Sequence, residues 1–251
     1  MKKFFIHYFS LLYSNLTTFY EDLFLKTKTI YSELTRVGFY RGKLKFKNDY
    51  SDFIEIKSSE GDFSEKLIIK EKYISRIIDN IFIKNNIKKK LFDLTGFNYS
   101  IDFLLAYSTY NINESNIKKD IYANHWHKDK PFSKNTLKII LPIDEILKDN
   151  GPMEIIPIKI SDKINFSSNL KEIDFPDKYK LVGNEEDIFF FLPNLCYHRA
   201  GIPLLGLKRS QIMLQLNPSK EWKYSINLYK KQYLLEPKFP TFNLSDNYKL
   251  I

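Results

Sequence analysis

The second half of the sequence alternates short apolar runs with turn residues, and this pattern constrains the fold more than any other feature. Turn residues such as Asn150-Gly151-Pro152 and Pro193-Asn194 separate the runs. The runs are Ile101–Tyr107, Leu137–Leu141, Met153–Ile158, Tyr179–Val182, Asp187–Leu192, Tyr197–Gly201 and Gln211–Leu216. Many short strands at such spacing predict a β-sandwich or a jelly-roll barrel.

The first third of the sequence has a different, mainly helical pattern. Residues 3–25, 28–37 and 64–93 carry apolar side chains at helical spacing, which predicts three helices. The segment Lys43–Ile56 alternates as a strand does. We therefore expect a mainly β protein with a helical N-terminal layer.

One domain over residues 1–251 is the simplest organisation. A single all-β barrel of about 200–250 residues is ordinary, and 43% hydrophobic residues suffice for one core. Neither a repeat nor a linker is found. We divide the domain into a helical support at 1–97, a barrel core at 98–219 and an extension at 220–251 that packs outside.

The net charge of +9 comes mostly from lysine, since only five of the 39 basic residues are arginines. The lysines are dispersed and no nucleic-acid-binding motif is present, so a nucleic-acid partner is not expected. A/T-rich codons explain the abundance of Lys, Ile and Asn. An anionic small-molecule substrate also fits the charge.

Cys196 is the only cysteine, so the chain forms no internal disulfide and has no cysteine-based zinc site. A reducing cytoplasm is the expected location. The apolar start of the chain lacks a small-residue cleavage site and is shorter than the ~20 apolar residues of a membrane span. It predicts a first amphipathic helix and no membrane span.

Three of the four histidines lie in the strand-rich part of the sequence. His127 and Asp129 share one face if their segment is extended, because side chains at i and i+2 point the same way. His198 can supply a third ligand from a later strand. Two histidines and one carboxylate leave coordination positions open, which suits non-haem Fe(II). His125 shares the same face, so the spacing leaves His125 and Asp129 as alternatives.

Arg209 follows His198 by eleven residues, across the turn Gly201–Gly206 and onto the next strand. This connection can bring the two side chains together inside a barrel. A buried arginine is a natural counter-ion for a dicarboxylate, although a salt bridge at the rim is the alternative.

The sequence resembles the phytanoyl-CoA dioxygenase-like family of Fe(II)/2-oxoglutarate-dependent oxygenases over about residues 98–219. The matching segments are Trp126–Asp129, Asn150–Pro157, Glu186–Phe191, Tyr197–Gly201 and Lys208–Ser210, in order and at similar spacing. Each segment alone is a weak signal, whereas the ordered set is fairly specific.

The resemblance implies a double-stranded β-helix (jelly-roll or cupin-like) core. It implies that His127, Asp129 and His198 bind Fe(II) and that Arg209 pairs with the distal carboxylate of 2-oxoglutarate. Lys138 or Tyr122 could also help to bind this cosubstrate. The implied reaction uses O2, releases succinate and CO2, and oxidises a small organic substrate. Because halogenating relatives replace the carboxylate that Asp129 provides, hydroxylation is the expected outcome.

The sequence departs from the family after Pro157. The family often continues with Gly-Ser-His, whereas Ile158-Lys159-Ile160-Ser161 follows here. This loop borders the substrate side, so the departure weakens any analogy in substrate. Substrate identity, oligomeric state and the role of the helical third cannot be predicted from the sequence.

Two other functions remain open. The first is a cupin-type enzyme with His125, His127 and His198 as ligands and no need for 2-oxoglutarate. The second is a non-catalytic protein that binds an anionic partner through its basic surface and needs no iron.

Overall fold

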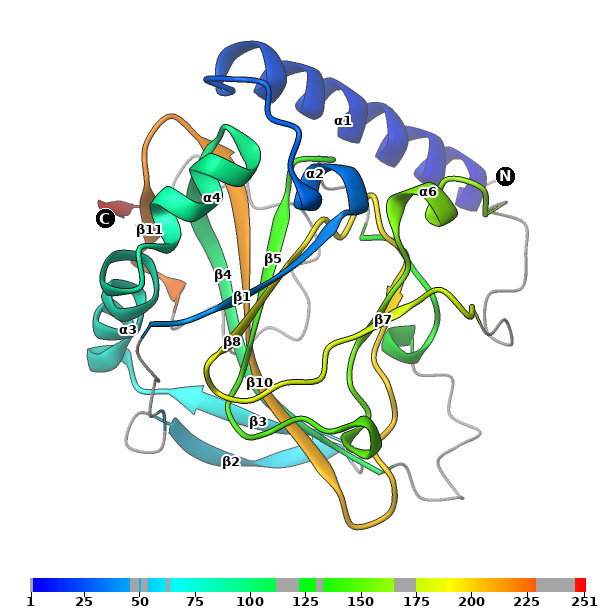
Figure 1. Cartoon of the computed structure of the whole chain (residues 1–251), viewed down its shortest axis with the longest axis vertical. Coiled ribbons are helices and arrows are strands. Elements are labelled where there is room, and N and C mark those ends of the chain that lie inside the picture. Colours follow the sequence, from blue (N-terminus) through cyan, green and yellow to red (C-terminus); the bar gives the residue numbers. More distant parts are fainter. Residues whose placement is uncertain are drawn as a thin grey trace.

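The computed structural model of the protein describes residues 2–45, 50, 54–61, 64–111, 122–129, 133–164, 175–228 and 247–251. The described fold is mixed α/β, with one large and almost wholly antiparallel sheet, a second small sheet and a long N-terminal helix (Figure 1).

The large sheet contains nine strands of the described residues, in the order β1-β8-β5-β10-β4-β11-β12, with β3 paired to β4 and β2 paired to β3. The pairs are antiparallel except for β11 beside β4. The strands are β1 (Phe39–Lys43), β2 (Ile54–Gly61), β3 (Ser64–Ile69), β4 (Asn98–Tyr110), β5 (Leu137–Pro142), β8 (Asp187–Phe191), β10 (Lys208–Ser219), β11 (Lys223–Ser225) and β12 (Tyr248–Leu250).

The small sheet has the order β7-β6-β9, formed by β7 (Tyr179–Lys180), β6 (Glu154–Ile155) and β9 (His198–Arg199). His127 adds a single antiparallel bridge to His198 at its free edge. The small sheet packs on one face of the large sheet, since Ile155 shares an apolar cluster with Ile140, Phe189 and Phe191.

Helices cover the other face of the large sheet. The helices of the described residues are α1 (Lys2–Phe24), α2 (Glu33–Val37), α3 (Glu71–Ile78), the π-helix η2 (Asp79–Lys84), α4 (Ile87–Thr95) and α6 (Ile158–Ser161), with 3-10 turns η3 (Tyr122–Asn124) and η4 (Lys148–Asn150). Apolar residues of α3, η2 and α4 form the largest core with β4, β5, β8 and β10. In Figure 1, α1 lies apart from this layer, along the outer edge beyond α2.

Alternation along the strands separates the two faces of the large sheet. In β8, Ile188 and Phe190 pack toward the helices, whereas Phe189 and Phe191 pack toward the small sheet. In β10, Ile212 and Leu214 join the helical core. The intervening residues of β10, which include Arg209, therefore face the small sheet.

The strands predicted after residue 98 are confirmed, and the helix predicted at 3–25 corresponds to α1. The helix predicted over 64–93 is wrong at its start, because 64–69 is strand β3, which pairs with β4. Sheet pairing overrides the local helical spacing there. The helix predicted at 28–37 is shorter in the structure, where it corresponds to α2 alone, because Ser32 caps its N-terminus. The strand predicted over Lys43–Ile56 has only its ends in β1 and β2, and residues 46–49 and 51–53 lie outside the described part.

Candidate metal centre

Backbone hydrogen bonds place two distant segments side by side. The His127 N–H donates to the His198 carbonyl (3.0 Å), and the His198 N–H donates to the His127 carbonyl (2.9 Å). The Asp129 N–H donates to the Pro193 carbonyl (3.0 Å). The segment after η3 therefore runs along the turn between β8 and β9, and its side chains meet that of His198.

Three side chains converge at this junction. One ligand atom from each of His127, Asp129 and His198 lies within 4.8 Å of the others. Asp129 Oδ1 is 3.7 Å from His127 Nε2 and 3.4 Å from His198 Nε2. His198 is 2% exposed, and the other two side chains are largely buried. Among the described residues, this is the group of histidine and carboxylate side chains that could hold a metal ion.

The second ring nitrogen of each histidine fixes the tautomer. His127 Nδ1 lies 2.7 Å from the His125 carbonyl, and His198 Nδ1 lies 3.1 Å from the Cys196 carbonyl. A carbonyl oxygen only accepts, so each Nδ1 carries the proton and donates it. Both Nε2 lone pairs consequently face Asp129 Oδ1. Three lone-pair donors directed at one point fit a cation, and the carbonyl contacts are those that orient metal-binding histidines.

The charges around the cluster favour its metal-binding protonation states. Burial, together with the neighbouring His198, lowers the pKa of His127 to about 3. Burial alone would raise the pKa of Asp129, but Lys138 and the two histidines hold it below the usual range of a carboxyl. Near neutral pH the site therefore offers a neutral His127 and an ionised Asp129 without deprotonation at these two groups.

Lys138 of β5 forms an ion pair with Asp129 Oδ2, and both side chains are 13% exposed. Asp129 therefore turns one oxygen toward the two histidines and the other toward an ammonium group. The sequence suggested Lys138 as a ligand for a cosubstrate and did not predict this contact. The side chain of Tyr122, suggested for the same role, lies outside the described part of the structure.

Arg209 is the second residue of β10, lies on the face that is directed toward the small sheet and is 1% exposed. Its Nη1 donates to the carbonyls of Gly151 and Gly201 (the latter at 3.3 Å), and its Nη2 donates to Thr109 Oγ1 at 3.3 Å. Its buried Nε has no hydrogen-bond partner within the described residues, and no described carboxylate pairs with it. Arg209 thus combines a buried charge with an unused donor.

The two carbonyls that contact Arg209 depend on a close crossing of two glycine segments. A Cβ on Gly151 would lie 2.3 Å from Pro203 N, and a Cβ on Gly201 would lie 2.4 Å from the Pro152 carbonyl. Gly151 also has a φ of +65°, which disfavours other residues. Because Gly201 is three residues beyond His198, this crossing links the arginine to β9, the strand that carries His198.

Other polar side chains of β10 share the face of Arg209. Gln211 donates from Nε2 to the Tyr107 hydroxyl (2.5 Å) on β4. Gln215 is paired in register with Lys138, and its buried Nε2 has no partner within the described residues. The sequence analysis missed both glutamines, although i+2 spacing from Arg209 would have placed them on its face.

The remaining sequence candidates lie outside the cluster. His125 contributes its carbonyl, and its side chain is not part of the metal-binding group. A bend after η3 breaks the alternation that would have aligned His125 with His127. Trp126 packs with Ile156 and Tyr197 near α6.

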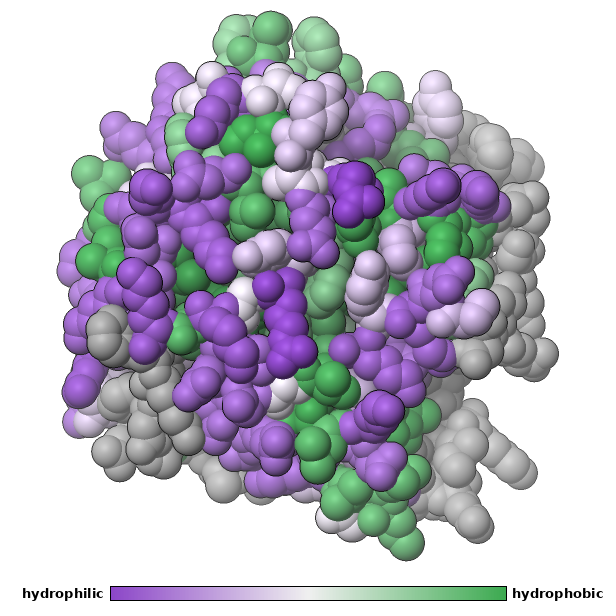
Figure 2. All heavy atoms as spheres, viewed as in Figure 1, coloured by the Kyte–Doolittle hydropathy of each residue, from purple (hydrophilic) through white to green (hydrophobic). Residues whose placement is uncertain are grey.

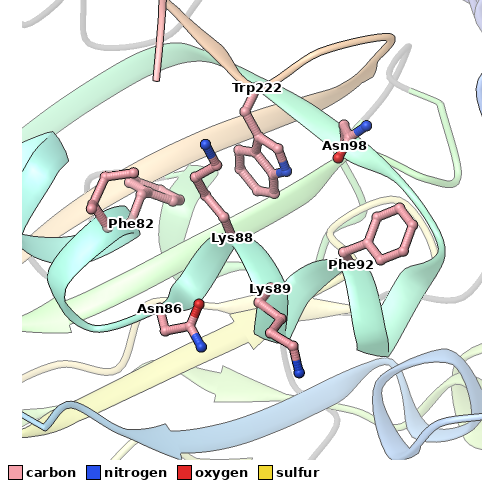
Figure 3. A pocket seen from close by; sticks show the side chains of 8 residues that line it. Phe82, Asn86, Lys88, Lys89, Phe92, Asn98 and Trp222 are labelled. Atoms are coloured by element: carbon pink, nitrogen blue, oxygen red, sulfur yellow. The ribbon is translucent and has the colours of Figure 1, made fainter.

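An open pocket of 470 Å³ lies elsewhere, on the helical side of the large sheet (Figure 3). Phe82, Lys88 and Phe92 come from the helices that line it, and Asn98 and Trp222 lie opposite them. None of the three clustered residues lines this pocket.

Among the described helices, none has the length and apolar character that a membrane span requires.

No protein-family profile matches the sequence, and no curated protein matches it. The phytanoyl-CoA dioxygenase-like assignment therefore stays a prediction.

The fold is similar to those of solved structures that contain 2-oxoglutarate (alpha ketoglutarate). HygX from Streptomyces hygroscopicus, with nickel, 2-oxoglutarate and hygromycin B bound, has 10% identity and a TM-score of 0.48 over 75% of this chain and 86% of that chain. The epimerase SnoN, in complex with Fe3+, alpha ketoglutarate and nogalamycin RO, has 10% identity and a TM-score of 0.49 over 74% and 80%. EvdO2 from Micromonospora carbonacea var. aurantiaca, complexed with 2-oxoglutarate, has 11% identity and a TM-score of 0.44 over 78% and 94%.

Proposed function

We propose that the protein is an Fe(II)- and 2-oxoglutarate-dependent oxygenase that hydroxylates a small organic substrate. The observation that carries the proposal is the buried cluster of His127, Asp129 and His198, in which both Nε2 atoms face one carboxylate oxygen. We take the two facing sheets as the walls of a double-stranded β-helix, with the cluster at the edge of the small sheet.

The donor set is one that non-haem Fe(II) uses. Two imidazole nitrogens and one carboxylate oxygen, all from one side, leave positions free for a cosubstrate and O2. A structural zinc site would use four protein ligands. The rival set with three histidines lacks support, because the His125 side chain is outside the cluster.

Arg209 is the proposed partner of the distal carboxylate of 2-oxoglutarate. The carbonyls of Gly151 and Gly201 hold its guanidinium on the inner face, and Nε remains without a partner among the described residues. A carboxylate is the acceptor that a buried arginine favours, because it neutralises the charge and accepts in a bidentate manner. The scarcity of arginine makes this placement informative: only five occur in the chain.

Each of the other residues then has a structural task. When bound, Fe(II) supplies the oxidation of 2-oxoglutarate and substrate with O2, giving succinate and CO2. The His125 and Cys196 carbonyls keep the imidazoles in the tautomer that exposes Nε2. Lys138 holds the second oxygen of Asp129, so that Oδ1 remains directed at the histidines. Phe191, whose ring centroid is 5.1 Å from that of His198, excludes water on the sheet side.

The direct test is the visible spectrum of the anaerobic protein on addition of Fe(II) and then 2-oxoglutarate. We expect a weak metal-to-ligand charge-transfer band that needs both additions. His127→Ala and Asp129→Ala should lose the band and retain the fold by circular dichroism. His125→Ala is the matched control and should keep the band, since the His125 side chain is not part of the ligand group and its backbone carbonyl remains in the variant.

Three results would contradict the proposal. Loss of the band in His125→Ala but not in Asp129→Ala would show that the third metal ligand is His125 and not the Asp129 carboxylate. Iron binding without any band on adding 2-oxoglutarate would show that the reaction does not use this cosubstrate. Absence of iron binding would favour a non-catalytic protein that binds an anionic partner through its basic surface.

A further inference from the structure

Helix α1 is oriented with its polar side toward the protein. Ser14 and Glu21 are both 3% exposed. Asn194 Nδ2 donates to Ser14 Oγ (3.0 Å), and the Ser133 hydroxyl donates to Glu21 Oε2. A surface helix of a globular protein normally turns its apolar side inward. Polar contacts fix α1 here, and its apolar side is left outside.

The outward side of α1 carries a continuous row of large apolar residues, which we call the outer stripe. Its members and exposed fractions are Tyr8 (58%), Phe9 (62%), Leu12 (43%), Leu16 (61%), Phe19 (67%), Tyr20 (51%) and Leu23 (59%). Figure 2 shows apolar side chains projecting along the outer edge of the molecule over α1. Single exposed apolar residues are common, but a contiguous row of this kind marks an interaction surface.

The spacing of the outer stripe fits a second helix. Phe9, Leu12, Leu16, Phe19 and Leu23 follow one another at intervals of three and four residues. This is the alternation of a and d positions in a coiled coil, which keeps one seam facing a partner helix. The mean interval of 3.5 residues is maintained over most of the helix, so the partner surface is long and narrow.

The size of the outer stripe fits a protein interface. Its exposed fractions correspond to roughly 800 Å² of side-chain surface, given ~150–250 Å² for each large side chain. A stable interface buries about 800 Å² on each partner. The stripe alone therefore supplies the area that one side of a dimer needs.

The charges on α1 disfavour a membrane surface as the partner. Helices that lie on membranes carry lysine or arginine along the polar side. In α1 only Lys2 and Lys3, at its start, are basic. Residues 4–25 contain no lysine or arginine, and the charged residues Glu21 and Asp22 are acidic. In addition, the polar side of α1 is engaged by the protein itself.

We propose that the outer stripe is a homodimer interface in which α1 of one copy packs against α1 of a second copy. An identical, self-complementary patch on both chains gives a closed two-fold contact. Because Leu16 is at the middle of the stripe, it lies closest to the two-fold axis and meets the same residue of the second copy. This inference is independent of the chemistry proposed for the metal centre.

The test is the mass of the full chain in solution, by size-exclusion chromatography with light scattering at micromolar concentration. We expect twice the mass of a single chain for the natural sequence and for Tyr31→Glu. Tyr31 is 97% exposed and lies off the helix, so it controls for the added charge. The double variant Leu16→Glu/Phe19→Glu should be monomeric with an unchanged circular dichroism spectrum, since both side chains are already exposed.

Cross-linking provides a second test that does not depend on folding of a charged variant. Under oxidation, Leu16→Cys should form a covalent dimer, whereas Tyr31→Cys should not, and the natural Cys196 is buried. A monomeric natural chain, or a dimer that Leu16→Glu/Phe19→Glu does not disrupt, would overturn the proposal. A monomer that binds anionic lipid vesicles through α1 would replace the second copy by a membrane.

Discussion

Glu21 is expected to make the protein less stable as the pH rises through neutrality. Its carboxyl is buried between α1 and the segment after Asp129. Hydrogen bonds from Ser133 and Asn135 favour the ionised form, but burial has the larger effect and raises the pKa of Glu21 to about 7 from its ordinary 4.5. No described lysine or arginine pairs with it. The folded state thus binds a proton that the unfolded state releases.

Proton linkage gives the sign and the size of the pH effect of Glu21 on the free energy of unfolding. Between pH 4.5 and 7 the folded state binds more protons than the unfolded state, so the free energy of unfolding falls as the pH rises. The contribution of Glu21 is fully present below pH 4.5 and is lost through pH 7. A displacement from 4.5 to about 7 corresponds to about 3 kcal/mol.

Glu21→Gln keeps the shape and removes the titration. We expect it to match the natural protein near pH 4.5 and to be more stable by about 3 kcal/mol at pH 8. Denaturant unfolding across this range measures the difference. Asp22→Asn, at a neighbouring carboxyl that is 44% exposed, controls for the loss of one negative charge. If Glu21→Gln retains the full pH dependence of the natural protein, the assignment to this buried carboxyl is wrong.

Three further predictions concern the metal centre and its support. Arg209→Met should weaken 2-oxoglutarate binding to the Fe(II) protein roughly 10- to 150-fold, because a hydrogen bond between charged groups contributes about 1.5–3 kcal/mol. Anaerobic calorimetry measures this affinity, and iron binding should be retained. An unchanged affinity would exclude Arg209 as the partner of 2-oxoglutarate. Lys138→Met leaves Asp129 buried without its cation, so the melting temperature should fall without metal and rise more on Fe(II) addition than in the natural protein. Gly151→Ala should lower the free energy of unfolding by at least about 3 kcal/mol, and Gly206→Ala by about 1 kcal/mol, as measured by denaturant unfolding. Both glycines have a positive φ, but only Gly151 has close neighbours. Equal losses would refute the structural role of the glycine crossing.

The strands of the second half were predictable because turn residues separate short apolar runs. β8 and β10 fall where their sequences indicate. β8 alternates between two apolar clusters, whereas β10 alternates between the helical core and a face that carries Arg209, Gln211 and Gln215. β3 was missed because Leu67, Ile68 and Ile69 continue the apolar spacing of α3. Only the long-range register with β4 distinguishes them, and a local pattern contains no such information.

The residue types of the candidate metal centre were predictable, but alternation alone left His125 and Asp129 as alternatives and only the family resemblance favoured Asp129. Alternation placed His125, His127 and Asp129 on one face of a strand. The structure gives a turn at η3 and a backbone bond from Asp129 to Pro193, so only two of the three remain together. The contact of Lys138 with Asp129 depends on how β5 packs beside this segment, which no spacing predicts.

The orientation of α1 follows from what its inner side must do. Ser133 and Asn194, which bind Glu21 and Ser14, lie four residues from Asp129 and His198, respectively. The inner side of the helix therefore contacts both segments that carry the clustered side chains, and the polar groups that it buries there require polar partners. Since a helix has only one other side, its large apolar residues face outward, where a second copy can cover them. The polar contacts to the segments that carry the clustered side chains and the apolar outer stripe are thus two consequences of one amphipathic sequence.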